Sequence, residues 1–318
     1  MIEKENPYFL KDTLNEAQKS VRSVHVSMDG QTLASGSTDN KVRIYRLENG
    51  RYVLKEELNE AQDNIWSVYM SGSGQILISG SLDKKVRIYR FESGRYALKE
   101  TLDEAGDCVL SVHISEDGQL LMSGSADNNV RVYHLEGGRY VLKETLREAK
   151  ASICSVIMSR DGQTLASGSD DKKVRVYRLE NGQYALKEIL DDAQDYIMSV
   201  HMSGAGQTLA SGGIDYTMRV YRFDGKQYVF KDMFGEAKKY VMSVCVSEDG
   251  KILVSGSADN KTRVYRLESG RYALKETLDE AQDFILSVHM SRDNQTLVSG
   301  SYDAKVRIYR LRERPKIS

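Results

Sequence analysis

The sequence has few of the residues that mark several common classes of protein. Its 318 residues include three cysteines, two prolines and one tryptophan. The cysteines, Cys108, Cys154 and Cys245, are too few and too scattered for a disulfide framework or a zinc site. No run approaches the ~18 apolar residues of a membrane span, and the opening segment MIEKENPYFL lacks the basic region and apolar core of a signal peptide. We therefore expect a cytoplasmic protein that uses no metal ion or other cofactor.

An excess of charge of one sign is also lacking. The chain has 45 basic and 46 acidic residues and a formal net charge of -1, so the protein as a whole does not attract phosphate backbones or anionic membranes. Arginine and lysine recur in segments such as KVRIYR and GRY, where they alternate with Glu48, Glu56 and Glu57. We interpret these segments as a solvated outer rim of mixed charge. Nucleic-acid and membrane partners are therefore disfavoured.

The most prominent feature that is present is a repeat of 44 residues. Ser-Gly-Ser triplets, with one Ser-Gly-Gly variant, follow one another at this spacing along the chain. The triplets begin at Ser35, Ser79, Ser123, Ser167, Ser211, Ser255 and Ser299. Because repeat architectures grow by adding units to one body, we predict a single domain over residues 1–318, in which residues 312–318 form a tail.

Each unit is predicted to contain four short strands. In the first unit, VRSVHVS ends at a turn-forming Asp-Gly pair, QTLASGS precedes a polar turn, and KVRIYRL alternates as strands do. The fourth segment, RYVLKEEL, leaves an alternative open. Its equivalent at 275–284, KETLDEAQDF, is made of strong helix formers, so a β-β-β-α unit is conceivable. We favour an all-β unit because Tyr52 and Leu54 alternate and strands flank the segment closely.

The two ends of the chain predict how the units close. Residues 7–14 match the fourth strand of a unit, but the other three strands do not precede them. Residues 285–311 supply three strands and stop before a fourth. In a ring, the N-terminal strand completes the last unit and removes an open sheet edge. The sequence therefore predicts an all-β, seven-bladed β-propeller of four-stranded antiparallel blades.

The stretch between Ser23 and Tyr45 resembles a unit of the WD-repeat β-propeller family. It contains Asp-Gly in the first turn, Leu-Ala-Ser-Gly-Ser in the second strand, an aspartate in the next turn, and Val-Arg-Ile-Tyr in the third strand. Two signature pairs depart from the family pattern, because Tyr45-Arg46 stands for Trp-Asp and Glu16-Ala17 for Gly-His. The resemblance implies a propeller in which the family's Trp, Ser, His and Asp hydrogen-bond network cannot form.

The aspartate of that family network persists in every unit. We expect these side chains to cap backbone N–H groups of the tight turn that they occupy. The seven positions are Asp39, Asp83, Asp127, Asp171, Asp215, Asp259 and Asp303.

The sequence contains no recognisable catalytic constellation. The Ser-Gly-Ser triplets have no histidine partner, and the glycines belong to turns and not to a phosphate-binding loop. His25, His113, His201 and His289 occupy the same site in alternate units. We expect them to pack between blades, too far apart to share one metal ion. We therefore predict that the protein is not an enzyme.

A few positions differ between otherwise similar units, and most of them are apolar. The family resemblance implies that they open onto the face around the central channel. Aromatic and methionine side chains with little charge are typical of the core of a protein interface. The predicted partner-binding residues are Trp66, Leu82, Leu110, Tyr196, Met198, Ile214, Tyr240, Met242, Phe284, Leu286 and Tyr302.

These observations favour a monomeric, non-enzymatic scaffold that binds a protein or peptide partner on its channel face. The alternative is a mainly structural propeller without a dedicated ligand, since high identity between units is also typical of recent amplification or deliberate construction. In that case several of the variable apolar side chains simply pack between blades.

Overall fold

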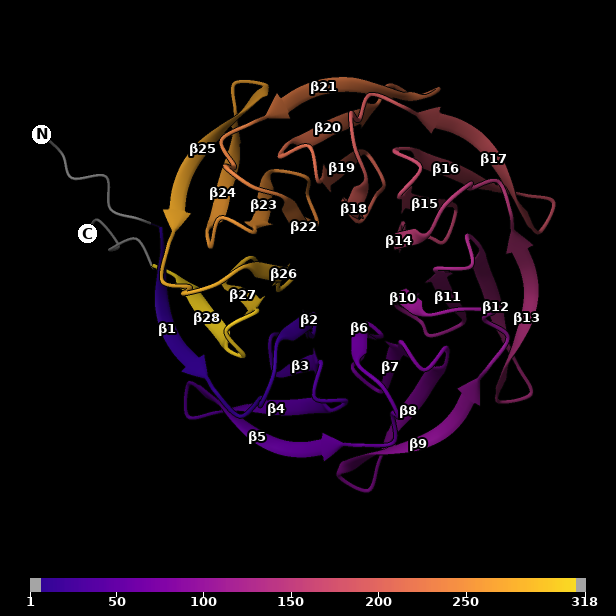
Figure 1. Cartoon of the computed structure of the whole chain (residues 1–318), viewed down its shortest axis with the longest axis vertical. Coiled ribbons are helices and arrows are strands. Elements are labelled where there is room, and N and C mark those ends of the chain that lie inside the picture. Colours follow the sequence, from indigo (N-terminus) through magenta and orange to yellow (C-terminus); the bar gives the residue numbers. More distant parts are fainter. Residues whose placement is uncertain (1–6, 313–318) are drawn as a thin grey trace, which may run out of the picture.

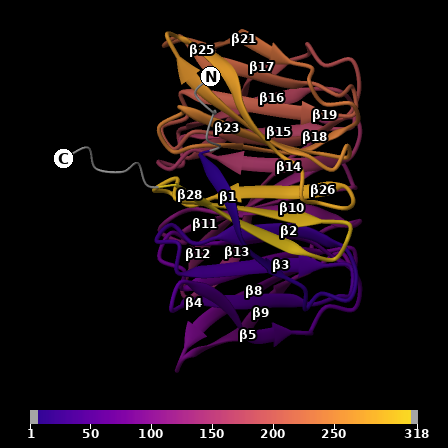
Figure 2. The same ribbon diagram turned by 90° about the vertical axis from the view of Figure 1, so that its left-hand side faces the viewer.

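The computed structural model describes residues 7–312, which form a closed ring of seven four-stranded antiparallel sheets around a central channel (Figure 1). Figure 2 shows the same ring edge-on. The predicted seven-bladed propeller is thus confirmed. The predicted tail lies, apart from Arg312, outside the described residues. Within residues 7–312, no helix is long and apolar enough to cross a membrane.

The two inner strands of each blade come from the alternating segments that precede and contain the Ser-Gly-Ser triplet. The innermost strands are β2 (Val21–Val26), β6 (Ile65–Met70), β10 (Val109–Ile114), β14 (Ile153–Met158), β18 (Ile197–Met202), β22 (Val241–Val246) and β26 (Ile285–Met290). The second strands are β3 (Thr32–Ser37), β7 (Ile76–Ser81), β11 (Leu120–Ser125), β15 (Thr164–Ser169), β19 (Thr208–Gly213), β23 (Ile252–Ser257) and β27 (Thr296–Ser301).

The two outer strands follow in sequence order. The third strands are β4 (Val42–Glu48), β8 (Val86–Glu92), β12 (Val130–Glu136), β16 (Val174–Glu180), β20 (Met218–Phe223), β24 (Thr262–Glu268) and β28 (Val306–Leu311). The fourth strands are β5 (Arg51–Leu58), β9 (Arg95–Leu102), β13 (Arg139–Leu146), β17 (Gln183–Leu190), β21 (Tyr228–Phe234), β25 (Arg271–Leu278) and, at the N-terminus, β1 (Tyr8–Leu14).

The helix-prone fourth segment is a strand in all seven blades, so the β-β-β-α alternative is wrong. In β5, Tyr52 and Leu58 are buried, whereas Arg51, Val53 and Lys55 are exposed. Pairing with the third strand and burial of the tyrosine outweigh the local helix propensity of the segment. The helix-forming residues beyond the strand become the loop to the next blade.

The ring closes as the chain ends predict. Strand β1 pairs antiparallel with β28, with Tyr8 opposite Leu311 and Leu14 opposite Val306. Strand β25 of the sixth blade also binds β1. The backbone N–H of Tyr8 donates to both carboxylate oxygens of Glu276, at 3.2 and 3.1 Å. The N-terminal strand therefore covers the outer edge of β28 and completes the last blade.

The glycine of each triplet lies where the next blade approaches most closely. A Cβ placed on Gly256 would lie 2.5 Å from Ile285 Cγ2 and 2.9 Å from Val288 Cγ1. No side chain fits at such a distance, so the missing Cβ lets neighbouring blades pack in direct contact. This packing requirement explains why the triplet recurs once per unit.

A serine on each innermost strand joins neighbouring blades around the channel. Its hydroxyl accepts a hydrogen bond from the backbone N–H of a valine in the adjacent blade. The pairs are Val24–Ser287, Val68–Ser23, Val112–Ser67, Val156–Ser111, Val200–Ser155, Val244–Ser199 and Val288–Ser243, at 3.0 to 3.1 Å. These bonds link all seven blades, including the first to the last.

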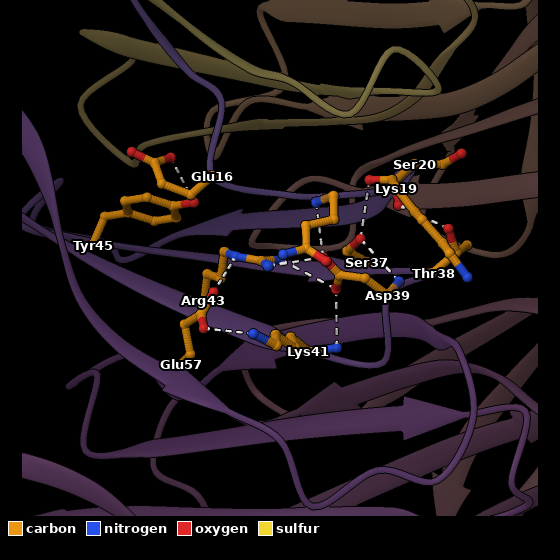
Figure 3. A network of polar contacts seen from close by, with 11 residues as sticks. Glu16, Lys19, Ser20, Ser37, Thr38, Asp39, Lys41, Arg43, Tyr45 and Glu57 are labelled. Atoms are coloured by element: carbon orange, nitrogen blue, oxygen red, sulfur yellow. Dashed lines mark hydrogen bonds and ion pairs between the residues drawn. The ribbon is translucent and has the colours of Figure 1, made fainter.

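A buried ion pair joins the turn aspartate to the third strand in each blade, as Figure 3 shows for the first blade. In the first blade the guanidinium of Arg43 lies 2.8 Å from Asp39 and 2.8 Å from Glu57. Asp39 also accepts from the backbone N–H groups of Lys41 and Gln18, at 3.2 and 2.9 Å. Arg43 and its six equivalents are buried, so the expectation of a solvated rim is wrong for these arginines.

The two departures from the family signatures contact each other. The hydroxyl of Tyr45, from the Tyr-Arg pair, donates to the carboxylate of Glu16, from the Glu-Ala pair, at 3.3 Å (Figure 3). The same bond occurs, for example, between Tyr265 and Glu236 at 3.1 Å. A buried tyrosine hydroxyl needs a hydrogen-bond partner. The two substitutions are therefore coupled, because the glutamate supplies the acceptor that the tyrosine requires.

Candidate functional site

One mouth of the central channel is an apolar pocket of about 380 Å³. It lies at the start of the innermost strands, where the variable positions of the repeat come together. The pocket contains seven of the eleven residues predicted to bind a partner: Trp66, Leu110, Tyr196, Met198, Ile214, Met242 and Leu286. They come from blades that are far apart in sequence, and only the ring brings them to one place.

The other four predicted residues, Leu82, Tyr240, Phe284 and Tyr302, do not line the pocket. Three of them form aromatic pairs outside it. The ring centroids of Phe284 and Tyr302 lie 6.1 Å apart, and those of Tyr240 and Tyr216 lie 5.6 Å apart. Tyr302 is 54% exposed. These pairs extend the aromatic surface of blades five to seven beyond the pocket.

Sequence reasoning missed Tyr216, which is also exposed. Its backbone φ of 66° lies in the left-handed region, in a turn where the other blades have asparagine, lysine or alanine. An aromatic residue in this conformation is uncommon. Comparing that turn position between units would have revealed it.

The pocket also has a polar side, which the predicted partner-binding residues do not include. Arg22 lies over the ring of Trp66, with its guanidinium carbon 3.5 Å from the ring centroid. In blade four, the Cys154 thiol donates to Asp170 Oδ1 at 3.1 Å. All four residues line the pocket. The mouth therefore combines an apolar wall with one cationic and one anionic side chain.

The channel narrows below this pocket into a layer built from one residue of each blade. Its members are His25, Tyr69, His113, Ile157, His201, Cys245 and His289, which line a cavity of about 110 Å³. The rings touch: the centroid of His25 lies 4.0 Å from that of His289 and 3.9 Å from that of Tyr69.

This layer corrects the expected position of the histidines. The centroids of His201 and His289, two blades apart, are only 6.4 Å from each other, so the histidines converge in the channel and do not pack separately between blades. Burial lowers the pKa of His289 and His113 to about 3 and that of His201 to about 4. Within residues 7–312, no group of three or more potential ligands is arranged to hold a metal ion.

Charged side chains bridge the opposite mouth of the channel. Arg160 in blade four forms ion pairs with Glu116 in blade three, at 2.8 Å, and with Glu248 in blade six. Backbone bonds from Gly72 N to Glu116 O, at 3.0 Å, and from Arg160 N to Gly204 O, at 2.9 Å, join further turns there. The two ends of the channel thus differ in chemistry: ion pairs bridge this end, whereas the other end opens into the pocket that contains Trp66 and Met242.

The repeats match a known family. The WD40 family (WD domain, G-beta repeat) matches residues 10–46, 53–90, 97–134, 141–178, 229–266 and 273–310. The stretch between the fourth and fifth matched segments contains β17 to β20, which repeat the same strand pattern, so the structure shows a seventh unit there as well. No curated protein matches the chain in sequence. The six matches cover well over half of the chain, and with the seven-bladed ring they show that it belongs to the WD40 family.

Proposed function

We propose that this protein is a non-enzymatic scaffold or adaptor that binds a protein or peptide partner at the apolar mouth of its channel. WD40 propellers are commonly protein-interaction scaffolds. The observation that carries the proposal is the gathering of Trp66, Met198, Met242 and Leu286 in one pocket. Aromatic and methionine side chains at the centre of a concave surface are typical of interface hot spots.

The pocket and the exposed aromatic pairs beside it, Tyr216–Tyr240 and Phe284–Tyr302, which we call the aromatic rim, together suit a peptide in an extended conformation. The pocket has room for a few side chains of the partner. The exposed aromatic pairs around Tyr240 and Tyr302 offer further contact area. Tyrosine gives a large amphipathic contact at low cost in side-chain entropy. We propose that the protein works as a cytoplasmic monomer, which leaves this face free for the partner.

The test is selection of peptides from a randomised display library on the purified protein. The selected peptides are then measured against a variant with charge in the pocket, Met242→Glu. The matched control is Met233→Glu, which introduces the same charge at a methionine that is 57% exposed on the outer strand β21. We expect the selected peptides to lose at least tenfold in affinity for the first variant, about 1.4 kcal/mol, and to bind the control unchanged.

Equal binding to both variants would place the peptides elsewhere and refute the proposed site. If selection on the wild-type protein enriches no peptide at all, the alternative of a structural propeller without a ligand stands. Circular dichroism of both variants checks that the blades remain folded.

A further inference from the structure

Arg22 is a cation in the channel-mouth pocket without an acidic partner. In the part of the chain that the structure describes, no carboxylate forms an ion pair with it. Besides burial, the group that affects its pKa is the hydroxyl of Tyr302. Arg43, by contrast, contacts two carboxylates. Burial lowers the pKa of Arg22 to about 10, so the side chain stays charged at neutral pH. A half-buried charge without a counter-ion is costly, and an anion in the pocket would remove that cost.

The indole of Trp66 fixes the position of this cation. Its ring lies 3.5 Å from the guanidinium carbon, a cation–π contact that covers one face of the planar group. Such stacking leaves the N–H groups at the edge of the guanidinium to bind a ligand, and these match the two oxygens of a carboxylate. The exposed edge of this guanidinium is therefore complementary to a carboxylate, and the one carboxylate that lines the pocket, that of Asp170, accepts from the Cys154 thiol in blade four.

The other half of the pocket requires an apolar group. Met198, Met242 and Leu286 line it from blades five, six and seven, and Arg22 follows in blade one. A ligand that carries a carboxylate beside an apolar side chain satisfies both halves at once. The terminal residue of a polypeptide has this arrangement, because its side chain and its carboxylate leave the same Cα.

The channel narrows below the pocket, which favours a chain end over an internal segment. The serine hydroxyls at its base already bond to neighbouring blades. Beneath them the rings of His25, Tyr69 and His289 narrow the channel. A chain end needs only one path into a pocket that narrows, whereas an internal segment must enter and leave again.

We propose that the channel mouth binds the C-terminal residue of a partner polypeptide, with the terminal carboxylate on Arg22 and an apolar last side chain against Met198, Met242 and Leu286. This inference rests on the proposed function, because it names the partner chemistry of the same pocket. The preceding residues of the partner then leave the pocket across the aromatic rim.

Trp66, the only tryptophan of the chain, reports directly on the pocket through its fluorescence. The probes are three pools of randomised hexapeptides: free acids without Asp or Glu, the same sequences as C-terminal amides, and amides that contain one Asp or Glu. We expect the free-acid pool to change the emission of Trp66 saturably. Peptides resolved from it should end in Leu, Ile, Val, Met or Phe, and their amides should bind at least tenfold more weakly.

Two variants test whether Arg22 causes the preference for the free acid over the amide. Arg22→Met keeps an apolar stem without the charge and should abolish the preference for the free acid, whereas Arg22→Lys should retain part of it. The matched control is Lys239→Met, which removes another cation of the same face, 5.2 Å from the ring of Phe284 and outside the pocket. The control should keep the full preference. Thermal melts confirm that all three variants are folded.

The possible failures are distinguishable. If acids and amides bind equally well, the carboxylate inference is refuted and the peptide site stands. If only the Asp- or Glu-containing amides bind, the carboxylate belongs to an internal side chain and the C-terminal occupant is wrong. If Arg22→Met keeps the preference for the free acid, Arg22 does not bind the carboxylate. If no pool changes the emission of Trp66, both the inference and the proposed function fail.

Discussion

Asp259 accepts hydrogen bonds from both terminal nitrogens of Arg263, at 3.1 Å to Oδ1 and 2.7 Å to Oδ2. It also accepts from the backbone N–H groups of Lys261 and Lys238, at 3.2 and 2.9 Å. One carboxylate thus ties together the turn, the third strand and the loop that enters the blade. Burial alone would raise the pKa of Asp259, but the bonds from Arg263 and Lys238 outweigh it and lower that pKa.

Removing the carboxylate of Asp259 should therefore destabilise the folded protein strongly. We expect Asp259→Ala to lower the free energy of unfolding by about 3–5 kcal/mol, because it leaves the buried cation of Arg263 without a partner. The measurement is urea denaturation followed by circular dichroism. Asp279→Ala, at an exposed aspartate, is the control and should change stability by less than about 0.5 kcal/mol. An equally small effect at both sites would show that the ion pair is not structural.

The closure of the ring should depend on pH through Glu276. This glutamate is 3% exposed and holds the N–H of Tyr8, and its burial raises its pKa to about 7. The folded protein therefore binds this proton more tightly than the unfolded chain does. Its stabilising effect is full below the unfolded pKa of about 4.5 and is lost as the pH rises through 7. We expect stability to fall by about 2–3 kcal/mol between pH 5 and pH 8 from this group.

Thermal melts across that range check the effect. Glu276→Gln keeps an acceptor for Tyr8 without a charge and should flatten the dependence on pH. The control is Glu144→Gln at the corresponding contact in the ring, where Glu144 is only half-buried and accepts from Tyr184 N at 2.9 Å. A variant at Glu276 that follows the wild-type pH profile would contradict the prediction.

The glycine of the triplet should tolerate no side chain. We expect Gly256→Ala to cost about 1–3 kcal/mol of stability, because its Cβ would overlap Ile285 Cγ2. Ile285→Ala removes that methyl group, so the double variant should lose less stability than the two single variants together. Gly235→Ala, with open space around its added Cβ, is the neutral control. Additive effects in the double-mutant cycle would show that the two residues do not oppose each other.

The channel histidines should be neutral throughout the physiological range. The N–H of Val246 donates to Nδ1 of His201 at 3.1 Å, so neutral His201 carries its proton on Nε2. Burial keeps its pKa at about 4. Nitrogen-15 NMR of labelled histidine should show this tautomer at pH 7 and no titration of His201 above pH 5. A midpoint near 6.5 would mean that water solvates the channel layer freely.

The sequence by itself determined the number of blades, their strand order and the closure by residues 7–14. These follow from local rules: alternation sets which face of a strand is buried, turn pairs end the strands, and a constant spacing counts the units. It also singled out the apolar residues that line the pocket, because positions that vary in a near-identical repeat stand out without any structure. Seven of the eleven predicted residues meet there, including Trp66 and Met242.

Only the tertiary structure decided which side chains meet across blades. The alternation that puts Arg43 on a strand gives no sign that Asp39 and Glu57 neutralise it in the interior. Repeat spacing likewise places His201 and His289 two units apart, but the innermost strands converge on the axis and bring their rings together. The repeat pattern likewise does not show that Arg22 lies over the ring of Trp66, which belongs to the next blade. Distances between side chains of different units depend on the radius of the ring, which no local pattern encodes.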